Sequence, residues 1–179
     1  AVELNGVKII GDYAFTSTSL TEIVIPDGVN TIGHNAFSAI KTASSVTIGR
    51  DVASIGNNAF NQHKGNVIIP EDNLLSNIGD NAFSMAQGEG TLNLPYIVTI
   101  GLKAFLLGKS FTQINIGPYI ETIGAQAFEY NEKATITVDK DEEFITIGKN
   151  AFRMTPAEKL IFNANITGNE NTKIDYEKH

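Results

Sequence analysis

The clearest pattern in this 179-residue chain is a six-residue phrase, Ile32-Gly33-His34-Asn35-Ala36-Phe37. The general form Ile-Gly-x-x-Ala-Phe occurs seven times, beginning at Ile10, Ile32, Ile55, Ile78, Ile100, Ile123 and Ile147. Successive motif glycines lie 22, 23, 23, 22, 23 and 24 residues apart. Self-similarity at a nearly fixed period of this length indicates a repeat protein, in which every copy forms the same structural unit.

A second element lies between the copies, and its apolar residues alternate. The clearest examples are Ile23-Val24-Ile25-Pro26, Val46-Thr47-Ile48-Gly49, Val67-Ile68-Ile69-Pro70, Leu92-Asn93-Leu94-Pro95 and Ile114-Asn115-Ile116-Gly117. Alternation places the two apolar side chains on one face of a strand, and a following proline cannot donate a hydrogen bond to the ladder. Each segment is therefore predicted to be a short β-strand.

The repeated phrase predicts a turn that packs closely on its neighbours. Its glycine permits a tight turn or a close approach of backbones. The next residue is Asp12, Asn57 or Asp80 in three copies, a residue type that caps helical turns, so we expect a brief helical or 3₁₀ turn there. The phenylalanines should point inward and stack as an apolar spine formed by Phe15, Phe37, Phe60, Phe83, Phe105, Phe128 and Phe152.

One such unit cannot close a core alone, so the units must stack into a solenoid. We expect a right-handed coil with short parallel β-strands on one face and turns or short 3₁₀ or helical segments on the other. The chain contains 23 Ile against 10 Leu, which favours β-rich coils over helical repeats. Residues 1–163 should form the solenoid, and the polar residues 164–179 a C-terminal cap or a tail.

The repeat resembles that of the BspA-like, or Treponema pallidum-type, leucine-rich repeat proteins. Their unit looks like Leu-x-x-Ile-x-Ile-Pro-x-x-Val-x-x-Ile-Gly-x-x-Ala-Phe, and the segment from Leu20 to Phe37 matches it throughout. The resemblance extends over about residues 2 to 162, with an extra acidic stretch at Asp139–Glu143. It implies a leucine-rich-repeat coil in a bacterial cell-surface or secreted protein, with adhesion to host proteins or other cells as its role.

Composition excludes several classes of partner. The formal net charge is −7, and Arg50 and Arg153 are the only arginines, so a nucleic-acid surface built on clustered cations is not expected. No run approaches the roughly 18 apolar residues of a membrane span. The chain opens at Ala1 without a basic and apolar leader. For the secreted or cell-surface location that the resemblance implies, the signal peptide is expected to have been removed.

The sequence indicates no catalytic residues, no cofactor and no metal site. Cysteine is absent, and His34, His63 and His179 stand apart from any triad or metal-ligand spacing. The acidic stretch Asp139–Glu143 could offer oxygens to a hard cation, but the pattern favours a solvated acidic insertion. Whether it binds a cation stays open, and the chain is predicted not to be an enzyme.

The outward side of the predicted strands is the first candidate binding surface. If the apolar pairs face the core, the residue between them faces solvent. This rule places one row on the sheet, formed by Val24, Thr47, Ile68, Asn93, Asn115, Thr137 and Ile161. The row is mainly neutral and hydrogen-bonding. The alternative is that these residues serve β propensity alone.

The second candidate surface lies where the strands end. Leu74, Tyr96 and Tyr119 each stand five residues before a motif glycine, in consecutive coils. Since neighbouring strands are about 4.8 Å apart, the two tyrosines should stack as a ladder. Exposed tyrosines are favoured interface anchors, although such a ladder could also simply cover a turn.

These observations predict a non-enzymatic, extracellular protein–protein interaction module that is adhesin-like and has a host extracellular or bacterial surface protein as its partner. A glycan-binding module that uses Tyr96, Tyr119, Asn93 and Asn115 is one alternative. A structural spacer of a larger surface protein is another.

Overall fold

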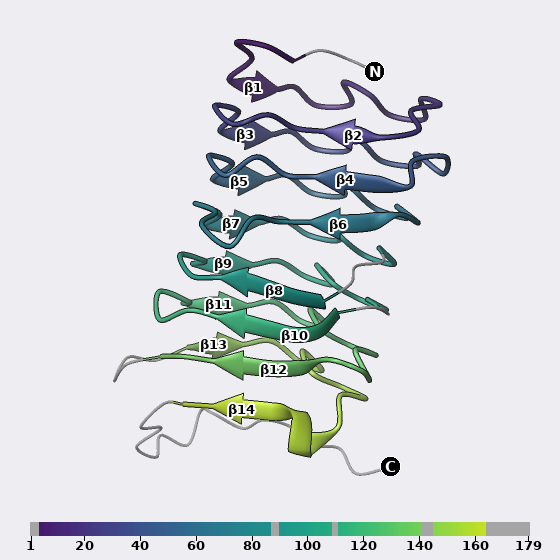
Figure 1. The fold of residues 1–179 in the computed structure, drawn as a ribbon. Coiled ribbons are helices and arrows are strands. Elements are labelled where there is room, and N and C mark those ends of the chain that lie inside the picture. The colour runs from purple at the N-terminus through teal and green to yellow at the C-terminus, as the bar shows by residue number, and fades with distance from the viewer. Residues whose placement is uncertain (1–3, 87–89, 109–110, 141–144, 164–179) are drawn as a thin grey trace.

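The protein is a stack of short coils in a computed structural model that describes residues 4–86, 90–108, 111–140 and 145–163 (Figure 1). Seven strands form one parallel sheet along the stack: β1 (Ile9–Ile10), β3 (Thr31–Ile32), β5 (Ser54–Ile55), β7 (Asn77–Ile78), β9 (Thr99–Ile100), β11 (Thr122–Ile123) and β13 (Thr146–Ile147). The other strands form two further sheets. One holds β2 (Ile23–Val24), β4 (Ser45–Thr47) and β6 (Asn66–Ile68), and the other holds β8 (Gly90–Leu94), β10 (Phe111–Ile116), β12 (Thr135–Val138) and β14 (Leu160–Phe162).

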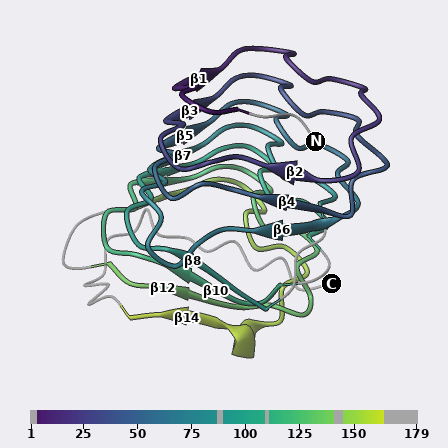
Figure 2. The same ribbon diagram turned by 45° about the horizontal axis from the view of Figure 1, so that its top comes forward.

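The register of the strands follows the sequence repeat. Ile10 pairs with Ile32 and Ile32 with Ile55, so each motif isoleucine lies beside its counterpart in the next coil. Figures 1 and 2 show the even-numbered strands running along one side of the stack and the odd-numbered strands along the other, with the chain winding as a right-handed coil. The predicted solenoid with short parallel strands is confirmed.

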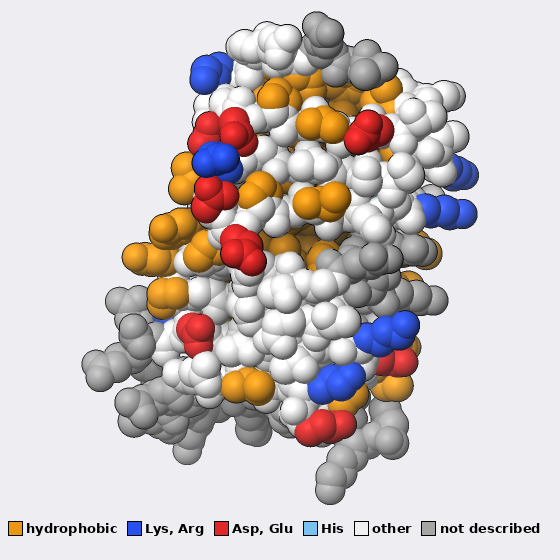
Figure 3. All heavy atoms as spheres, in the orientation of Figure 1, with side chains coloured by type: hydrophobic (Ala, Val, Ile, Leu, Met, Phe, Trp, Pro, Cys, Tyr) orange, Lys and Arg blue, Asp and Glu red, His pale blue; other side chains and the backbone are white. Residues whose placement is uncertain are grey.

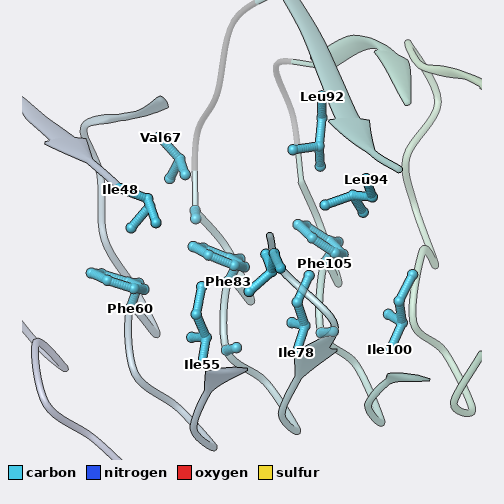
Figure 4. Close-up of a cluster of buried hydrophobic side chains, with 14 of the residues drawn as sticks. Ile48, Ile55, Phe60, Val67, Ile78, Phe83, Leu92, Leu94, Ile100 and Phe105 are labelled. Atoms are coloured by element: carbon cyan, nitrogen blue, oxygen red, sulfur yellow. The ribbon is translucent and has the colours of Figure 1, made fainter. Parts of the chain in front are cut away.

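The phenylalanine spine is confirmed as well. Rings of successive motif phenylalanines, from Phe15 to Phe152, stack with centroids 5.1 to 5.7 Å apart and planes within 13° of parallel. Isoleucines from both strand layers pack around the rings, as Figure 4 shows for Ile48, Ile55 and Ile78. Stacking adds to the burial of apolar surface, so each ring of the spine contributes to stability.

The motif glycines allow the coils to approach each other. A Cβ on Gly56 would lie 2.7 Å from the carbonyl carbon of Gly33 and 2.7 Å from the backbone nitrogen of His34. Gly124 is similarly crowded, with Gly101 and Leu102 atoms at 2.5 Å. No real Cβ tolerates such contacts with backbone, which explains the glycine in the six copies from Gly33 to Gly148; Gly11, in the first coil, has nothing within 4 Å.

The segments after the motif glycines are turns, and the only helix in the described part of the chain is the 3₁₀ helix η1 (Ala157–Lys159), which lies outside them. Two residues of each segment, the second and the sixth after the glycine, have positive φ. The second positions are Tyr13, Asn35, Asn58, Asn81, Lys103, Gln126 and Asn150, and the sixth are Ser17, Ala39, Gln62, Met85, Leu107, Tyr130 and Met154. Asparagine fills four of the second positions because it tolerates the left-handed conformation best among residues with a Cβ.

The sequence suggested that Asp12, Asn57 and Asp80, each the residue after a motif glycine, cap a helical turn of their own coil, and this is wrong. In the first four copies the side chain of this residue bonds to the next coil instead. Oδ1 of Asp12 accepts a hydrogen bond from the backbone N–H of His34 at 2.7 Å, and Nδ1 of His34 accepts one from Asn57 at 2.9 Å. The series continues along the stack. Oδ1 of Asn57 accepts a hydrogen bond from the backbone N–H of Asp80, and Oδ1 of Asp80 accepts one from the backbone N–H of Leu102, both at 2.8 Å. The side chains thus form a ladder along the stack.

The even-numbered strands are interrupted between β6 and β8, which belong to different sheets. In the preceding coils, backbone hydrogen bonds join the strands of adjacent coils on this side; for example, the N–H of Ile48 donates to the carbonyl of Ile68 at 2.9 Å. At the interruption the buried side chain of Asn73 takes over, because its Nδ2 donates to the carbonyl oxygens of Pro70 at 2.7 Å and Asn93 at 2.9 Å. We call this interruption the seam. It separates an N-terminal half, residues 4–86, from a C-terminal half, residues 90–163.

Candidate binding surfaces

The predicted sheet-face row faces outward. Val24, Ile68 and Ile161 are exposed, and the four polar members, Thr47, Asn93, Asn115 and Thr137, are half-buried by their neighbours. The flanking residues are the core residues, for example Ile23 and Ile25 beside Val24, so the alternation places the row as expected. That this row binds a partner stays a prediction.

The two halves of the molecule make this face differently. In the C-terminal half, Nδ2 of Asn115 donates to Oδ1 of Asn93 at 2.7 Å, and Nε2 of Gln113 donates to Oδ1 of Asn115 at 2.8 Å and to Oγ1 of Thr137 at 3.2 Å. Figure 3 shows separate hydrophobic side chains over the upper coils and a mainly neutral polar surface lower down. The amides therefore spend much of their hydrogen-bonding capacity on each other.

The strand-exit ladder, defined by Leu74, Tyr96 and Tyr119, is the more distinctive surface. The rings of Tyr96 and Tyr119 stack with centroids 6.1 Å apart and planes 29° from parallel, which confirms the predicted stacking. Both remain about half exposed, at 48% and 57%, and Leu74 is exposed in the preceding coil. Pro95 and Pro118 directly precede the two tyrosines, and their fixed φ stiffens the loop that presents the rings.

The same edge is charged in the N-terminal half. Arg50 pairs with Asp27 at 2.9 Å and with Asp72 at 3.1 Å. The hydrogen bond from the Arg50 backbone N–H, assisted by its guanidinium, lowers the pKa of Asp27. Asp51 also accepts a hydrogen bond from the backbone N–H of Gly28 at 2.7 Å. Figure 3 shows acidic and basic side chains gathered at the upper left of this face and hydrophobic ones below them.

Comparison with protein families assigns this architecture. The family model described as the BspA type leucine rich repeat region matches residues 8–135 and 76–174. The chain belongs to the BspA type leucine-rich repeat family. Leucine-rich repeats generally mediate protein interactions, and BspA type proteins are often associated with the cell surface. Searches among curated proteins and among solved structures found no match.

One surface of this BspA type solenoid escaped the sequence analysis. The sixth residue after the motif glycine is Ser17, Ala39 or Gln62 in the first three coils, and it then becomes apolar. The apolar members form what we call the turn-face stripe, which consists of Met85, Leu107, Tyr130 and Met154. Met85 and Met154 are 51% and 53% exposed. Alignment of this position across all seven copies would have found the stripe.

Within the described residues of this leucine-rich repeat protein, no cluster of three His, Asp or Glu side chains could hold a metal ion. The histidines are apart from one another: His34 is exposed, His63 is buried, and His179 lies outside the described residues. Residues 141–143 of the acidic stretch also lie outside them. No described helix is long and apolar enough to cross a membrane.

Proposed function

We propose that this chain is a non-enzymatic, extracellular protein-binding module of a bacterial surface or secreted protein, adhesin-like in role, and that the strand-exit ladder is its main contact surface. The observation that carries the proposal is the exposed stack of Tyr96 on Tyr119 beside Leu74. The two tyrosine rings are not part of the hydrophobic core, which the phenylalanine spine and the isoleucines already form.

The ladder has the chemistry of a protein hot spot. Tyrosine offers a large rigid surface with a polar tip, and it loses little conformational entropy when it is held at an interface. Stacking and the preceding prolines limit the motion of both rings before any partner arrives, which reduces the entropic cost of binding. The neutral polar residues Asn93, Asn115 and Thr137 of the sheet-face row, on β8, β10 and β12, precede the loops at this edge and would supply a polar rim.

A glycan-binding module is the second candidate, because an aromatic ring can stack on a sugar while nearby amide side chains hydrogen-bond its hydroxyl groups. Asn93 and Asn115, which lie three and four residues before Tyr96 and Tyr119, would have to hydrogen-bond the sugar. They are hydrogen-bonded to each other at 2.7 Å, so a sugar would compete with an existing bond. This cost favours the protein partner. A pure spacer would have no use for exposed stacked tyrosines.

The test is a binding screen of the chain against extracellular-matrix proteins and a glycan array, with the double variant Tyr96→Ala/Tyr119→Ala alongside. Tyr13→Asn is the matched control, because Tyr13 is exposed on a different side and Asn35 occupies its position in the next coil. Binding to a protein that the double variant loses and the control retains supports the proposal. Glycan binding with the same pattern supports the second candidate, and no binding in either screen favours the spacer.

A further inference from the structure

The turn-face stripe is an apolar feature that the fold does not need. Its four residues adopt the left-handed conformation, with φ of 60°, 57°, 62° and 63°, which residues with large side chains rarely occupy. The first three coils meet the same backbone demand with Ser17, Ala39 and Gln62. The exposed methionines Met85 and Met154 therefore serve neither the backbone conformation nor the core.

Three of the four backbone N–H groups beneath the stripe are already hydrogen-bonded to the next coil. The N–H groups of Met85, Leu107 and Tyr130 donate to the carbonyl oxygens of Leu106, Glu129 and Arg153 at 2.8, 3.0 and 2.9 Å. A strand added to a sheet edge depends on free backbone groups, so the occupied N–H groups at these three positions favour a partner that is held through its side chains.

The spacing of the stripe matches a helix better than an extended segment. One side chain per coil at about 4.8 Å spans about 14 Å over three intervals. Three turns of an α-helix span about 16 Å, whereas three same-face steps of a strand span about 20 Å. Methionine side chains adapt to surfaces that differ in detail, and they can absorb the remaining mismatch.

The charged side chains beside the stripe indicate which residues would flank the apolar face of a bound helix. In the segments that carry the stripe, residues 79–85, 101–107, 124–130 and 148–154, the charged side chains that are not buried are the cations Lys103, Lys149 and Arg153 and one anion, Asp80, whose Oδ1 already accepts a hydrogen bond from the backbone N–H of Leu102 at 2.8 Å. Glu129 is buried and paired with Arg153 at 2.9 Å. The guanidinium of Arg153 also lies 6.0 Å from the centre of the Tyr130 ring. This border is basic although the whole chain carries a net charge of −7.

We propose that the turn-face stripe is a second docking surface, distinct from the strand-exit ladder, and that it binds an amphipathic helix of a partner protein with acidic residues beside its apolar ridge. A second copy of this chain is a poorer occupant, because two identical stripes would bring like-charged borders together. The stripe begins at Met85, at the seam, and continues through the C-terminal half.

The probe is a display library of amphipathic helical peptides, three to four turns long, in which the residues flanking the apolar ridge are either Glu or Lys. Peptides with a strand-like alternation of the same composition serve as the comparison. We expect enrichment of the acid-flanked helices. Enrichment of the strand-like or Lys-flanked peptides, or of none, overturns the proposal.

The decisive variant is Met85→Asn/Met154→Asn. Asparagine suits the left-handed conformation, so the variant keeps or gains thermal stability while it removes the apolar ends of the stripe. We expect the Kd of the selected helix to rise at least about tenfold. Gln62→Asn is the control. It also places asparagine at the equivalent left-handed position, in an earlier coil that lies outside the stripe, and it should leave the Kd unchanged. Retained binding by the double variant overturns the proposal.

Two further measurements separate this surface from the alternatives. Tyr96→Ala/Tyr119→Ala should bind the selected helix normally, so a failure of the strand-exit ladder as a binding site would not affect this result. Sedimentation of the unmodified chain should show a monomer. A dimer that Met85→Asn/Met154→Asn dissociates would mean that a second copy is the occupant, and would overturn the helix proposal.

Discussion

The two halves of the solenoid share one core and present different surfaces. Phe60 in the N-terminal half and Phe128 in the C-terminal half are both fully buried and stack on two neighbours each. On the strand-exit edge, however, the N-terminal half carries the ion pairs of Arg50, whereas the C-terminal half carries Tyr96 and Tyr119. The same residue types therefore repeat from coil to coil in the interior of this protein, whereas the outward positions differ between the two halves.

The seam lies close to where the surfaces change. The sheet of β2, β4 and β6 stops there, and the amide network of Asn93, Gln113 and Asn115 begins in the next coil. The turn-face stripe also begins there, with Met85. The seven-stranded sheet continues without interruption on the other side, since β7 pairs with β9. One layer thus holds the halves together while the other allows them to differ, and both proposed binding surfaces lie mainly beyond the seam.

The largest expected effect tests the claim that the two cores are equivalent. Phe60→Ala and Phe128→Ala should each lower the free energy of unfolding by about 4 kcal/mol, because each removes a ring stacked on both sides and leaves a cavity. Phe15→Ala should cost markedly less, since Phe15 is partly exposed and stacks on Phe37 alone. Guanidinium denaturation followed by circular dichroism measures all three. A large difference between Phe60→Ala and Phe128→Ala would contradict equivalent cores.

A smaller effect comes from the close approach of the coils. Gly56→Ala and Gly124→Ala should each cost about 2–3 kcal/mol, because the new methyl group meets backbone atoms of the preceding coil and forces the coils apart. Gly11→Ala is the matched control, since nothing lies within 4 Å of its Cβ position. Thermal melts of the three variants give the comparison. Equal destabilisation by Gly11→Ala would show that the glycine serves backbone conformation and not close packing.

These interior features are also the ones that sequence reasoning predicted. A phenylalanine, an isoleucine and a glycine at a fixed period leave one arrangement in which all of them are buried, so the spine, the strands and the close approach follow from the pattern. The stacking of Tyr96 on Tyr119 follows from the same register.

The rest could not be predicted because it depends on contacts between coils that local preferences do not record. Asp12 and Asn57 are good helix caps in isolation, but in the stack the nearest free N–H belongs to the next coil. Met85 and Leu107 carry no signal for a left-handed conformation, and only their position in the coil imposes it. The seam rests on one asparagine, Asn73, whose role depends on a strand pairing that is absent.

Asn73→Ala tests whether the seam joins the halves. The substitution removes the side-chain donor to the carbonyl groups of Pro70 and Asn93 and the acceptor of the Leu75 N–H, at a cost of about 2 kcal/mol; the Pro70 carbonyl keeps the Asn73 backbone N–H at 3.3 Å. We expect faster hydrogen exchange on both sides of the seam, in β6 and β8, than in β4 and β10. Asn30→Ala is the control, because Asn30 is exposed and makes one long bond of 3.4 Å. Unchanged exchange in β6 and β8 would mean that the halves are joined by the seven-stranded sheet alone.

The smallest effect concerns one buried position that holds a titratable histidine in the N-terminal half and an uncharged asparagine in the C-terminal half. His63 and Asn131 both stand seven residues after a motif glycine, and both are fully buried. Burial lowers the pKa of His63, and neither ring nitrogen has a hydrogen-bond partner of normal geometry, although the backbone of Ile40 and Asn66 lies close enough to offset part of the shift.

The sign of the pH effect follows from that shift. Below the ordinary histidine pKa of 6.5 the unfolded chain binds a proton that the folded chain resists, so the free energy of unfolding should fall as the pH is lowered from 7 to 5. The slope for one such group is at most about 1.4 kcal/mol per pH unit. His63→Asn copies the residue of the C-terminal half and should flatten the profile. The lowered pKa of Asp27 affects stability only below about pH 4, outside this window. A profile that His63→Asn leaves unchanged would show that the interior near His63 admits the proton, and that the two halves do not differ in this respect.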